Sequence, residues 1–157
     1  MMNTSVSDLR TWQQWKQRDR LTLLAAFEDS ETCTRAKRFC ADLSRHLGAR
    51  CQIIQHVWVF STFRLRELRE IAAEEASVSD LVILSAHDAA SLPDEAKQWI
   101  DLWLQQKGRR PSALLALLDP LYSGQPSPIR MYLQGIAQRA GVDFLVSTDE
   151  AFGFQAA

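Results

Sequence analysis

Several polar side chains of this sequence directly follow apolar stretches, where side chains of their types can do chemistry. Glu28 and Asp29 follow the stretch 21–27, and His87 and Asp119 follow two later apolar stretches. The carboxylate oxygens of Glu28, Asp29 and Asp119 are hard donors that suit a divalent cation. His87 could transfer protons near neutral pH, or it could lie exposed in a loop or cap the next helix. The sequence therefore offers Glu28, Asp29 and Asp119 as a candidate metal set and His87 as a candidate active-site residue.

The residues after Glu28 have the composition of a helix start. Asp29 and Ser30 are both of a type that caps the amino end of a helix by accepting a hydrogen bond from its first turn. Glu31 would lie in that turn, where the positive end of the helix dipole favours a carboxylate. On these residues alone, we expect Asp29 or Ser30 to cap the first long helix.

Cysteine, nucleophile and nucleotide motifs do not occur in the sequence. The cysteines Cys33, Cys40 and Cys51 form no C-x-x-C pair and have no histidine at a spacing typical of zinc sites. Cys40 and Cys51 fall at apolar positions of a predicted helix and strand, whereas Cys33 falls in a first helical turn among carboxylates that disfavour its thiolate. No G-x-S-x-G, G-x-G-x-x-G or Walker loop is present. The sequence thus names no reaction.

Apolar stretches of strand length alternate with helical periodicity along the chain. Buried strands are predicted at residues 21–27, 51–60, 80–86, 112–118 and 142–147. Helices are predicted between them, at roughly residues 30–48, 62–77, 92–108 and 127–141. Leu65 and Leu68 are expected on the buried stripe of the second helix, and Trp99 and Trp103 on that of the third.

Strands that are apolar on both faces and alternate with helices predict one parallel sheet covered on both sides. This alternation of strands and helices indicates a three-layer α/β/α, doubly wound, five-stranded sheet of flavodoxin-like type, with strand order 2-1-3-4-5. In such folds a ligand crevice lies beyond the carboxyl ends of the strands. The polar residues described above would therefore gather at one edge.

The length of 157 residues fits one domain. Residues 20–157 form the predicted α/β core, and residues 1–19 form a predicted helical extension with Leu9, Trp12 and Trp15 on one stripe. That stripe either packs over the sheet edge or binds a partner.

Charge and hydropathy exclude two classes of partner. Eighteen basic and nineteen acidic residues leave a net charge of -1, which gives no excess to drive nucleic-acid binding. No apolar run approaches the length of roughly 20 residues that crosses a bilayer, and the first twenty residues contain no apolar run of signal-peptide length. We expect a cytoplasmic protein without nucleic-acid or membrane partners.

The stretch DLVILSAHDAASLPDEAKQWIDLW (residues 80–103) resembles a segment of the NADPH-dependent FMN reductases and related flavodoxin-like proteins. Corresponding positions of that segment are occupied here by the Leu-Pro dipeptide at residues 92–93 and by Lys97, Ile100 and Asp101. The segment SETCTR (residues 30–35) partly agrees with the phosphate loop of flavodoxins. The resemblance implies FMN as cofactor and a flavodoxin-like scaffold. The implied phosphate ligands are Ser30, Thr32, Thr34 and Arg35, and the residues implied around the flavin ring are Trp58, His87 and Tyr122.

Receiver domains of response regulators offer a second resemblance, because they share this topology and carry an acidic pair after the first strand. Glu28 and Asp29 stand at that pair, whereas Ser85 stands where the phosphorylated aspartate would be. This resemblance implies a receiver-like domain that is not phosphorylated.

Three functional hypotheses follow from the sequence. The first is a non-catalytic binding or regulatory module that acts with a protein partner or as a homodimer. The second is an FMN-binding NAD(P)H-dependent oxidoreductase with a divergent flavin pocket. The third is a divalent-cation site at Glu28, Asp29 and Asp119.

Overall fold

Strands and helices alternate along the chain in the computed structural model, which describes residues 13–87, 91–119, 127–147 and 154–156. The strands are β1 (Arg20–Phe27), β2 (Gln52–Val59), β3 (Leu81–Ser85), β4 (Ala113–Leu117), β5 (Asp143–Ser147) and β6 (Phe154–Ala156). The helices are α2 (Ser30–Leu47), the 3-10 helix η1 (Phe60–Arg64), α3 (Arg66–Ser77), α4 (Asp94–Lys107) and α5 (Pro128–Ala140).

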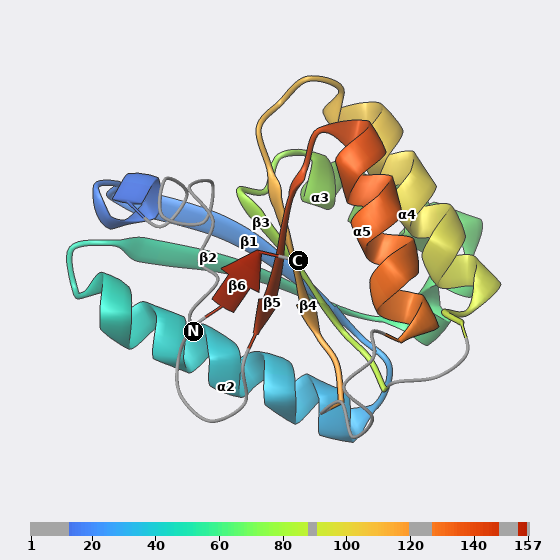
Figure 1. Cartoon of the computed structure of the whole chain (residues 1–157), viewed down its shortest axis with the longest axis horizontal. Helices are drawn as coiled ribbons and strands as arrows, with labels where there is room; N and C mark the ends of the chain where they lie inside the picture. Colours follow the sequence, from blue (N-terminus) through green and yellow to red (C-terminus); the bar gives the residue numbers. More distant parts are fainter. Residues whose placement is uncertain (1–12, 88–90, 120–126, 148–153, 157) are drawn as a thin grey trace.

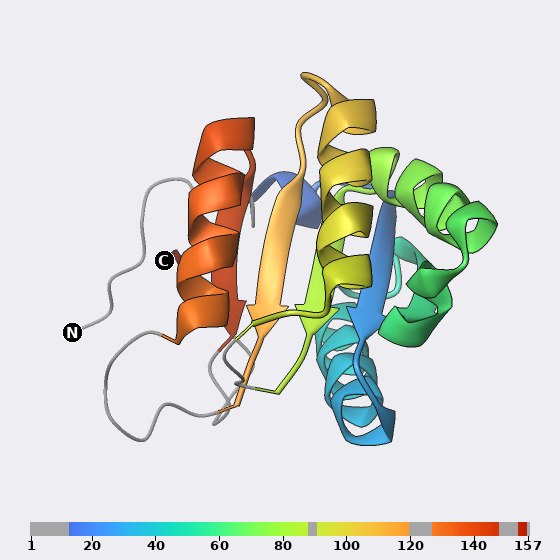
Figure 2. The same ribbon diagram turned by 90° about the vertical axis from the view of Figure 1, so that its right-hand side faces the viewer.

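The strands form a single sheet in the order β2-β1-β3-β4-β5-β6. All pairs from β2 to β5 are parallel, and Figure 2 shows the arrowheads of β1, β3, β4 and β5 pointing the same way. The predicted parallel sheet of order 2-1-3-4-5 is therefore confirmed. A sixth strand, β6, was not predicted from the sequence and adds to β5 in the antiparallel direction.

Helices cover the two faces of the sheet unequally (Figure 1). The helix α2 packs on one face, where Phe39 and Leu43 meet Leu21, Leu23 and the other side chains that point to that side. On the opposite face α3, α4 and α5 pack over the alternate residues of the same strands. Burial of every residue of β3 and β4 follows from this three-layer arrangement, because side chains alternate between two covered faces.

The start of α2 is fixed by a reciprocal cap. The Asp29 carboxylate accepts the backbone N–H of Thr32 at 3.0 Å, and the Thr32 hydroxyl accepts the N–H of Asp29 at 2.9 Å. This pattern satisfies two amide groups that the helix leaves without partners. Of the two predicted caps, Asp29 is therefore the one that is used. The helix ends at Gly48, whose positive φ of 86° suits glycine.

The connection from β2 to α3 differs from the expectation. Residues 60–64 form the 3-10 helix η1 rather than the first turn of an α-helix, and Phe60 and Phe63 are buried in it. Leu65, expected on the buried stripe, is 61% exposed. The prediction for Leu65 was wrong because the rings of Phe60 and Phe63 already fill the core beside α3. Leu65 itself precedes α3, which starts at Arg66.

An aromatic stack fills the core between η1 and α4. The Phe63 and Trp99 rings stack at 4.7 Å between centroids, and Trp103 continues the stack at 6.2 Å from Trp99. Both tryptophans are fully buried, which confirms their predicted positions. Neither indole N–H has a hydrogen-bond partner within the described part of the chain, so the apolar contacts must outweigh the cost of two unpaired donors.

Only the end of the predicted N-terminal extension lies in the described part of the chain. Residues 13–16 are helical, and Trp15 is buried with Phe39 and Leu43 of α2. For Trp15, packing over the sheet is the interpretation that holds; Leu9 and Trp12 lie outside the described residues. No helix among the described residues has the length and apolar character required to span a bilayer.

Candidate functional site

His87 lies just beyond the carboxyl end of β3, with its imidazole ring between two carboxylates. Its Nε2 atom is 2.8 Å from Oδ2 of Asp29, and its Nδ1 atom is 3.3 Å from Oδ1 of Asp119. Glu31 approaches Nε2 at 3.8 Å, and the His87 backbone N–H donates to Glu28 at 3.4 Å. The end of β1, the start of α2 and the end of β4 thus converge on one ring. This edge is where the fold was expected to gather its polar residues.

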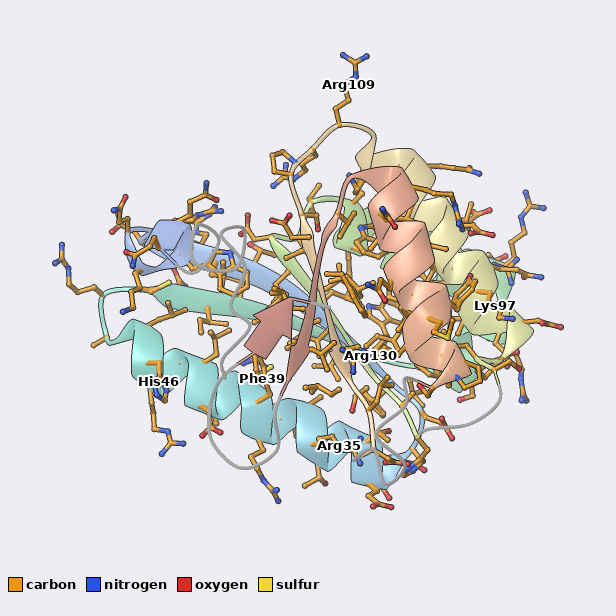
Figure 3. All side chains as sticks on the ribbon, in the orientation of Figure 1. Arg35, Phe39, His46, Lys97, Arg109 and Arg130 are labelled. Atoms are coloured by element: carbon orange, nitrogen blue, oxygen red, sulfur yellow. The ribbon has the colours of Figure 1, made fainter. Side chains whose placement is uncertain are left out.

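Arg35 of α2 reaches the same edge from the first turns of the helix (Figure 3). Its guanidinium lies 2.7 Å from the Asp119 carboxylate and donates longer hydrogen bonds to the carbonyl oxygens of Ala86 and Leu117. Arg35 therefore joins α2 to the ends of β3 and β4. Asp119 lies between the guanidinium of Arg35 and the imidazole ring of His87.

The residues below this cluster are tied together by buried hydroxyl groups. Thr32 is fully buried, and its oxygen accepts the backbone N–H groups of Glu28 and Asp29 at 2.9 Å each. The buried Ser85 hydroxyl donates to the Thr32 carbonyl at 2.8 Å, which fixes the start of α2 against the end of β3. These bonds hold Asp29 in place to face His87.

The carboxylates favour the protonated form of His87. The hydrogen bond to Asp29 raises the pKa of His87 above its ordinary value of 6.5, Asp119 adds to this effect, and partial burial opposes it. The N–H of Thr32 lowers the pKa of Asp29 below its ordinary value of 3.8, and His87 lowers it further against the effect of burial. The pair is therefore an imidazolium and a carboxylate over the range between these two values.

The His87 cluster should make folding stability depend on pH in a defined direction. Because the pKa of His87 is raised on folding, its contribution is complete below pH 6.5 and is lost as the pH rises through the folded pKa. Because the pKa of Asp29 is lowered, its contribution is complete above pH 3.8 and is lost as the pH falls through the folded pKa. The cluster therefore stabilises the fold most between these two ordinary values.

Two-dimensional NMR of the imidazole resonances measures this directly. We expect His87 to titrate above 6.5 in the wild type and at lower pH in Asp29→Asn, because the strongest hydrogen-bond acceptor is removed. Glu74→Gln, which removes a carboxylate from the outer surface of α3, is the matched control and should leave the His87 titration unchanged. A wild-type His87 that titrates below 6.5 would contradict the assignment.

The predicted metal set is brought together only in part. Ligand atoms of Glu28, Asp29 and His87 all lie within 4.8 Å of one another. Asp119, the third predicted ligand, contacts the opposite nitrogen of the His87 ring and pairs with Arg35. The side chain that completes a candidate set with Glu28 and Asp29 is thus His87.

The residues implied around a flavin are spread over different surroundings. Ser30 and Thr34 are exposed on the first turns of α2, whereas the buried Thr32 hydroxyl is engaged in the helix cap. The Trp58 ring lies 6.2 Å from that of Phe63, and its N–H donates to Glu75 of α3 at 2.8 Å. Tyr122 lies outside the described residues. Thr32, Asp29 and Arg35, three of the groups near a phosphate in that arrangement, make hydrogen bonds to other groups of the protein.

The cysteines follow their predicted environments. Cys40 and Cys51 are buried, and burial raises the pKa of the Cys40 thiol to about 11. Cys33 is partly exposed in the first turn of α2.

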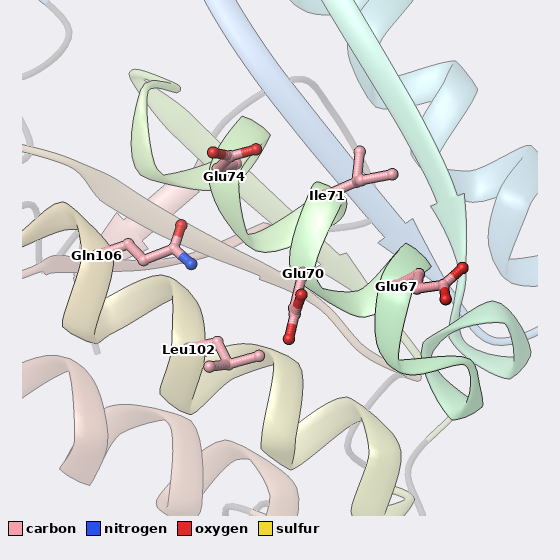
Figure 4. A pocket seen from close by; sticks show the side chains of 6 residues that line it. All are labelled: Glu67, Glu70, Ile71, Glu74, Leu102 and Gln106. Atoms are coloured by element: carbon pink, nitrogen blue, oxygen red, sulfur yellow. The ribbon is translucent and has the colours of Figure 1, made fainter.

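A groove lies away from the strand ends, between α3 and α4 (Figure 4). It encloses about 410 Å³ and was not predicted from the sequence. Its lining residues are Glu67, Glu70, Ile71, Glu74, Leu102 and Gln106. Three carboxylates and two aliphatic side chains give it an acidic surface without a nucleophile or a histidine.

No protein-family model, curated protein or solved structure matches the chain. What the protein does must therefore be inferred from its own contacts.

The pairing of these side chains was not predicted from the sequence. Arg35 was proposed as a phosphate ligand, yet it pairs with Asp119, 84 positions away. Ser85 was considered only as the replacement of an aspartate, yet its hydroxyl ties β3 to α2. The available signal was the polar residues Ser85 and Asp119 at the ends of two neighbouring strands. Their positions in the sequence do not show which side chains of α2 they will contact.

Proposed function

We propose that the chain is a non-catalytic binding or regulatory module. The observation that supports this most strongly is the engagement of both ring nitrogens of His87 by carboxylates, Asp29 on one side and Asp119 on the other. A general base must present an unprotonated nitrogen to its substrate. Both ring nitrogens of His87 instead face carboxylates of the protein itself, and the hydrogen bond to Asp29 raises the pKa of His87 above its ordinary value of 6.5.

The cationic groups of the cluster are also used internally. Arg35 contacts Asp119 and two carbonyl oxygens, so its charge is already balanced. Four carboxylates, those of Glu28, Asp29, Glu31 and Asp119, surround the two cations. A cluster of this kind positions the ends of β3 and β4 against α2 and makes their packing sensitive to protonation. In the proposed function this edge responds to its environment, while a partner binds elsewhere.

The alternative is an FMN-binding NAD(P)H-dependent oxidoreductase. It is supported by the sheet order and by the polar side chains at the carboxyl edge, where flavodoxin-like folds bind cofactors. It would require a phosphate to enter a helix start whose amide groups already bind Asp29 and Thr32. For this reason we rank it second.

A divalent-cation site is a further candidate, favoured by the proximity of Glu28, Asp29 and His87. Binding of a cation by His87 requires the unprotonated ring. Cation affinity should therefore increase as the pH rises through the His87 pKa.

Absorption and thermal unfolding together test these assignments. Protein mixed with FMN and desalted should show no flavin absorption under the proposed function, and retained flavin would establish the alternative instead. Unfolding is then followed with Mg²⁺, Mn²⁺ and Zn²⁺ at pH 5.5 and 7.5. A cation at 100 times its dissociation constant would stabilise the fold by about 2.7 kcal/mol. Stabilisation that appears only at the higher pH and is lost in Glu28→Gln would assign the ligand of the module as a cation.

A further inference from the structure

Within the part of the chain that the structure describes, the strand β2 forms one margin of the sheet. Its eight residues, Gln52–Val59, pair with β1 along their whole length. Among the described residues β1 is the only strand neighbour of β2, so the backbone N–H and C=O groups on its other side have no strand to bind (Figure 1). An unpaired edge of this length is a template for pairing with another strand.

The composition of β2 is unusual for an edge that must stay unpaired. Its sequence, QIIQHVWV, contains no lysine, arginine, aspartate, glutamate, proline or glycine. Natural proteins protect edge strands with such charges, with proline or with short length. The opposite margin follows that rule, because β6 has three residues. On β2, by contrast, Val57 is 48% exposed.

We propose that β2 pairs with β2 of a second copy of the chain, in the antiparallel direction across a two-fold axis perpendicular to the sheet. The two sheets then form one continuous sheet. This inference rests on the proposed function, since it names the partner of the binding module as another copy of this chain.

The charge of the strand favours a second copy as the occupant. Two copies of a charged edge would oppose like charges across the axis, whereas β2 carries no acidic or basic side chain other than His56. A two-fold axis also brings the same strand into both halves of the interface, so the exposed Val57 can meet an aliphatic residue of the same strand.

The alternation of side chains determines which residues face each other. Ile53 packs on the α2 side of the sheet, and Trp58 contacts Glu75 on the α3 side. A two-fold axis perpendicular to the sheet keeps each side chain on its own side, so the pairing must be centred on a residue and not between two residues. Registers centred on Gln55 or His56 pair seven of the eight residues of β2, 52–58 or 53–59, whereas registers centred on Ile54 or Val57 pair only five, 52–56 or 55–59.

Of these two longer registers, centring on Gln55 is the one that places an aliphatic side chain against the exposed Val57; it also sets Ile54 against the partner's His56 and Trp58 against the partner's Gln52. Gln55 then faces the partner's Gln55, whose amide can exchange hydrogen bonds with it, and Ile53 faces the partner's Val57. The exposed Val57 is thereby covered by an aliphatic side chain. Centring on His56 would set two imidazole rings directly opposite and would place Val57 against a glutamine. Centring on Ile54 would leave Trp58 beyond the paired segment.

Sedimentation velocity over a range of concentrations tests the interface. We expect a concentration-dependent dimer for the wild type and an association at least about tenfold weaker for Val57→Lys, because each copy then buries an ammonium group against isoleucine. Met131→Lys introduces the same charge at a position on α5 that is 62% exposed, and it should dimerise as the wild type does.

Disulfide cross-linking tests the register without relying on loss of binding. Gln55→Cys should form a covalent dimer on mild oxidation, since the two side chains meet at the axis. His56→Cys should not, because its two copies would be offset by more than the ~7 Å that a disulfide can bridge. Wild-type protein oxidised in parallel controls for Cys33, Cys40 and Cys51.

The outcomes separate this inference from the proposed function. A monomer at all concentrations, or a dimer that Val57→Lys leaves intact, overturns the β2 interface while leaving a binding module in place. Cross-linking of His56→Cys rather than Gln55→Cys overturns the register. Retained FMN in the absorption test overturns the proposed function but would not affect the cross-linking result.

Discussion

Replacement of Trp99 by alanine is expected to lower the free energy of unfolding by about 3–5 kcal/mol, the range for deletion of a buried aromatic side chain. Trp99 is fully buried and stacks between Phe63 and Trp103, so its loss opens a cavity between η1 and α4 and removes two ring contacts. Urea denaturation measures the change, and the midpoint should fall with little change in the slope. In a thermal scan the same loss corresponds to a melting temperature lower by roughly 6–20 °C.

Two variants control for this result. Trp99→Phe keeps a ring in the stack and removes an indole N–H that has no partner in the described part of the chain, so it should cost clearly less than alanine. Met131→Ala shortens an exposed side chain and should change stability by less than about 0.5 kcal/mol. If Trp99→Ala unfolded at nearly the wild-type midpoint, the aromatic stack would not be a main source of stability.

Replacement of Thr32 by valine is expected to have the next largest effect, a loss of about 1–3 kcal/mol. The valine side chain has the shape of threonine but cannot accept a hydrogen bond, so the backbone N–H groups of Glu28 and Asp29 lose the oxygen that they both bind. Because the site is buried, water does not readily replace that oxygen. Denaturant unfolding followed by circular dichroism gives the value.

The neighbouring Thr34 supplies a matched control. Its hydroxyl donates to the Ser30 carbonyl on the exposed side of the same helix turn. Thr34→Val should therefore change the free energy of unfolding little. Thr32→Ser keeps the hydroxyl oxygen and should retain most of the stability that Thr32→Val loses. Equal effects of valine at positions 32 and 34 would argue against the special role of the Thr32 hydroxyl.

The His87 cluster and the β2 edge give the protein two separable properties. Protonation of His87 acts at the carboxyl ends of the strands, where α2, β3 and β4 meet. The proposed dimer forms along the margin of the same sheet, through β2. Comparison of dimerisation at pH 5.5 and 7.5 would show whether these properties are coupled.

Local pattern was sufficient to predict the scaffold. Continuous apolar stretches that alternate with helical periodicity predict a parallel sheet covered on both faces, because the helix that connects two parallel strands packs on a face of the sheet. The burial of Trp99 and Trp103 followed from their spacing on α4, and residue type narrowed the cap of α2 to Asp29 or Ser30. Each of these features depends on residues that are neighbours in the sequence.

The pairing of charges and the edges of elements were decided only by the tertiary structure. Arg35 meets Asp119, and His87 meets Asp29, because parallel strands bring residues from distant positions to one edge. The short strand β6 and the 3-10 turn at Phe60–Arg64 arise from pairing and packing with elements elsewhere in the chain. Leu65 is exposed for the same reason, since two phenylalanine rings from η1 already occupy the core beside α3. The sequence determined which surfaces had to be buried, and the three-dimensional packing determined which polar groups would meet beside them.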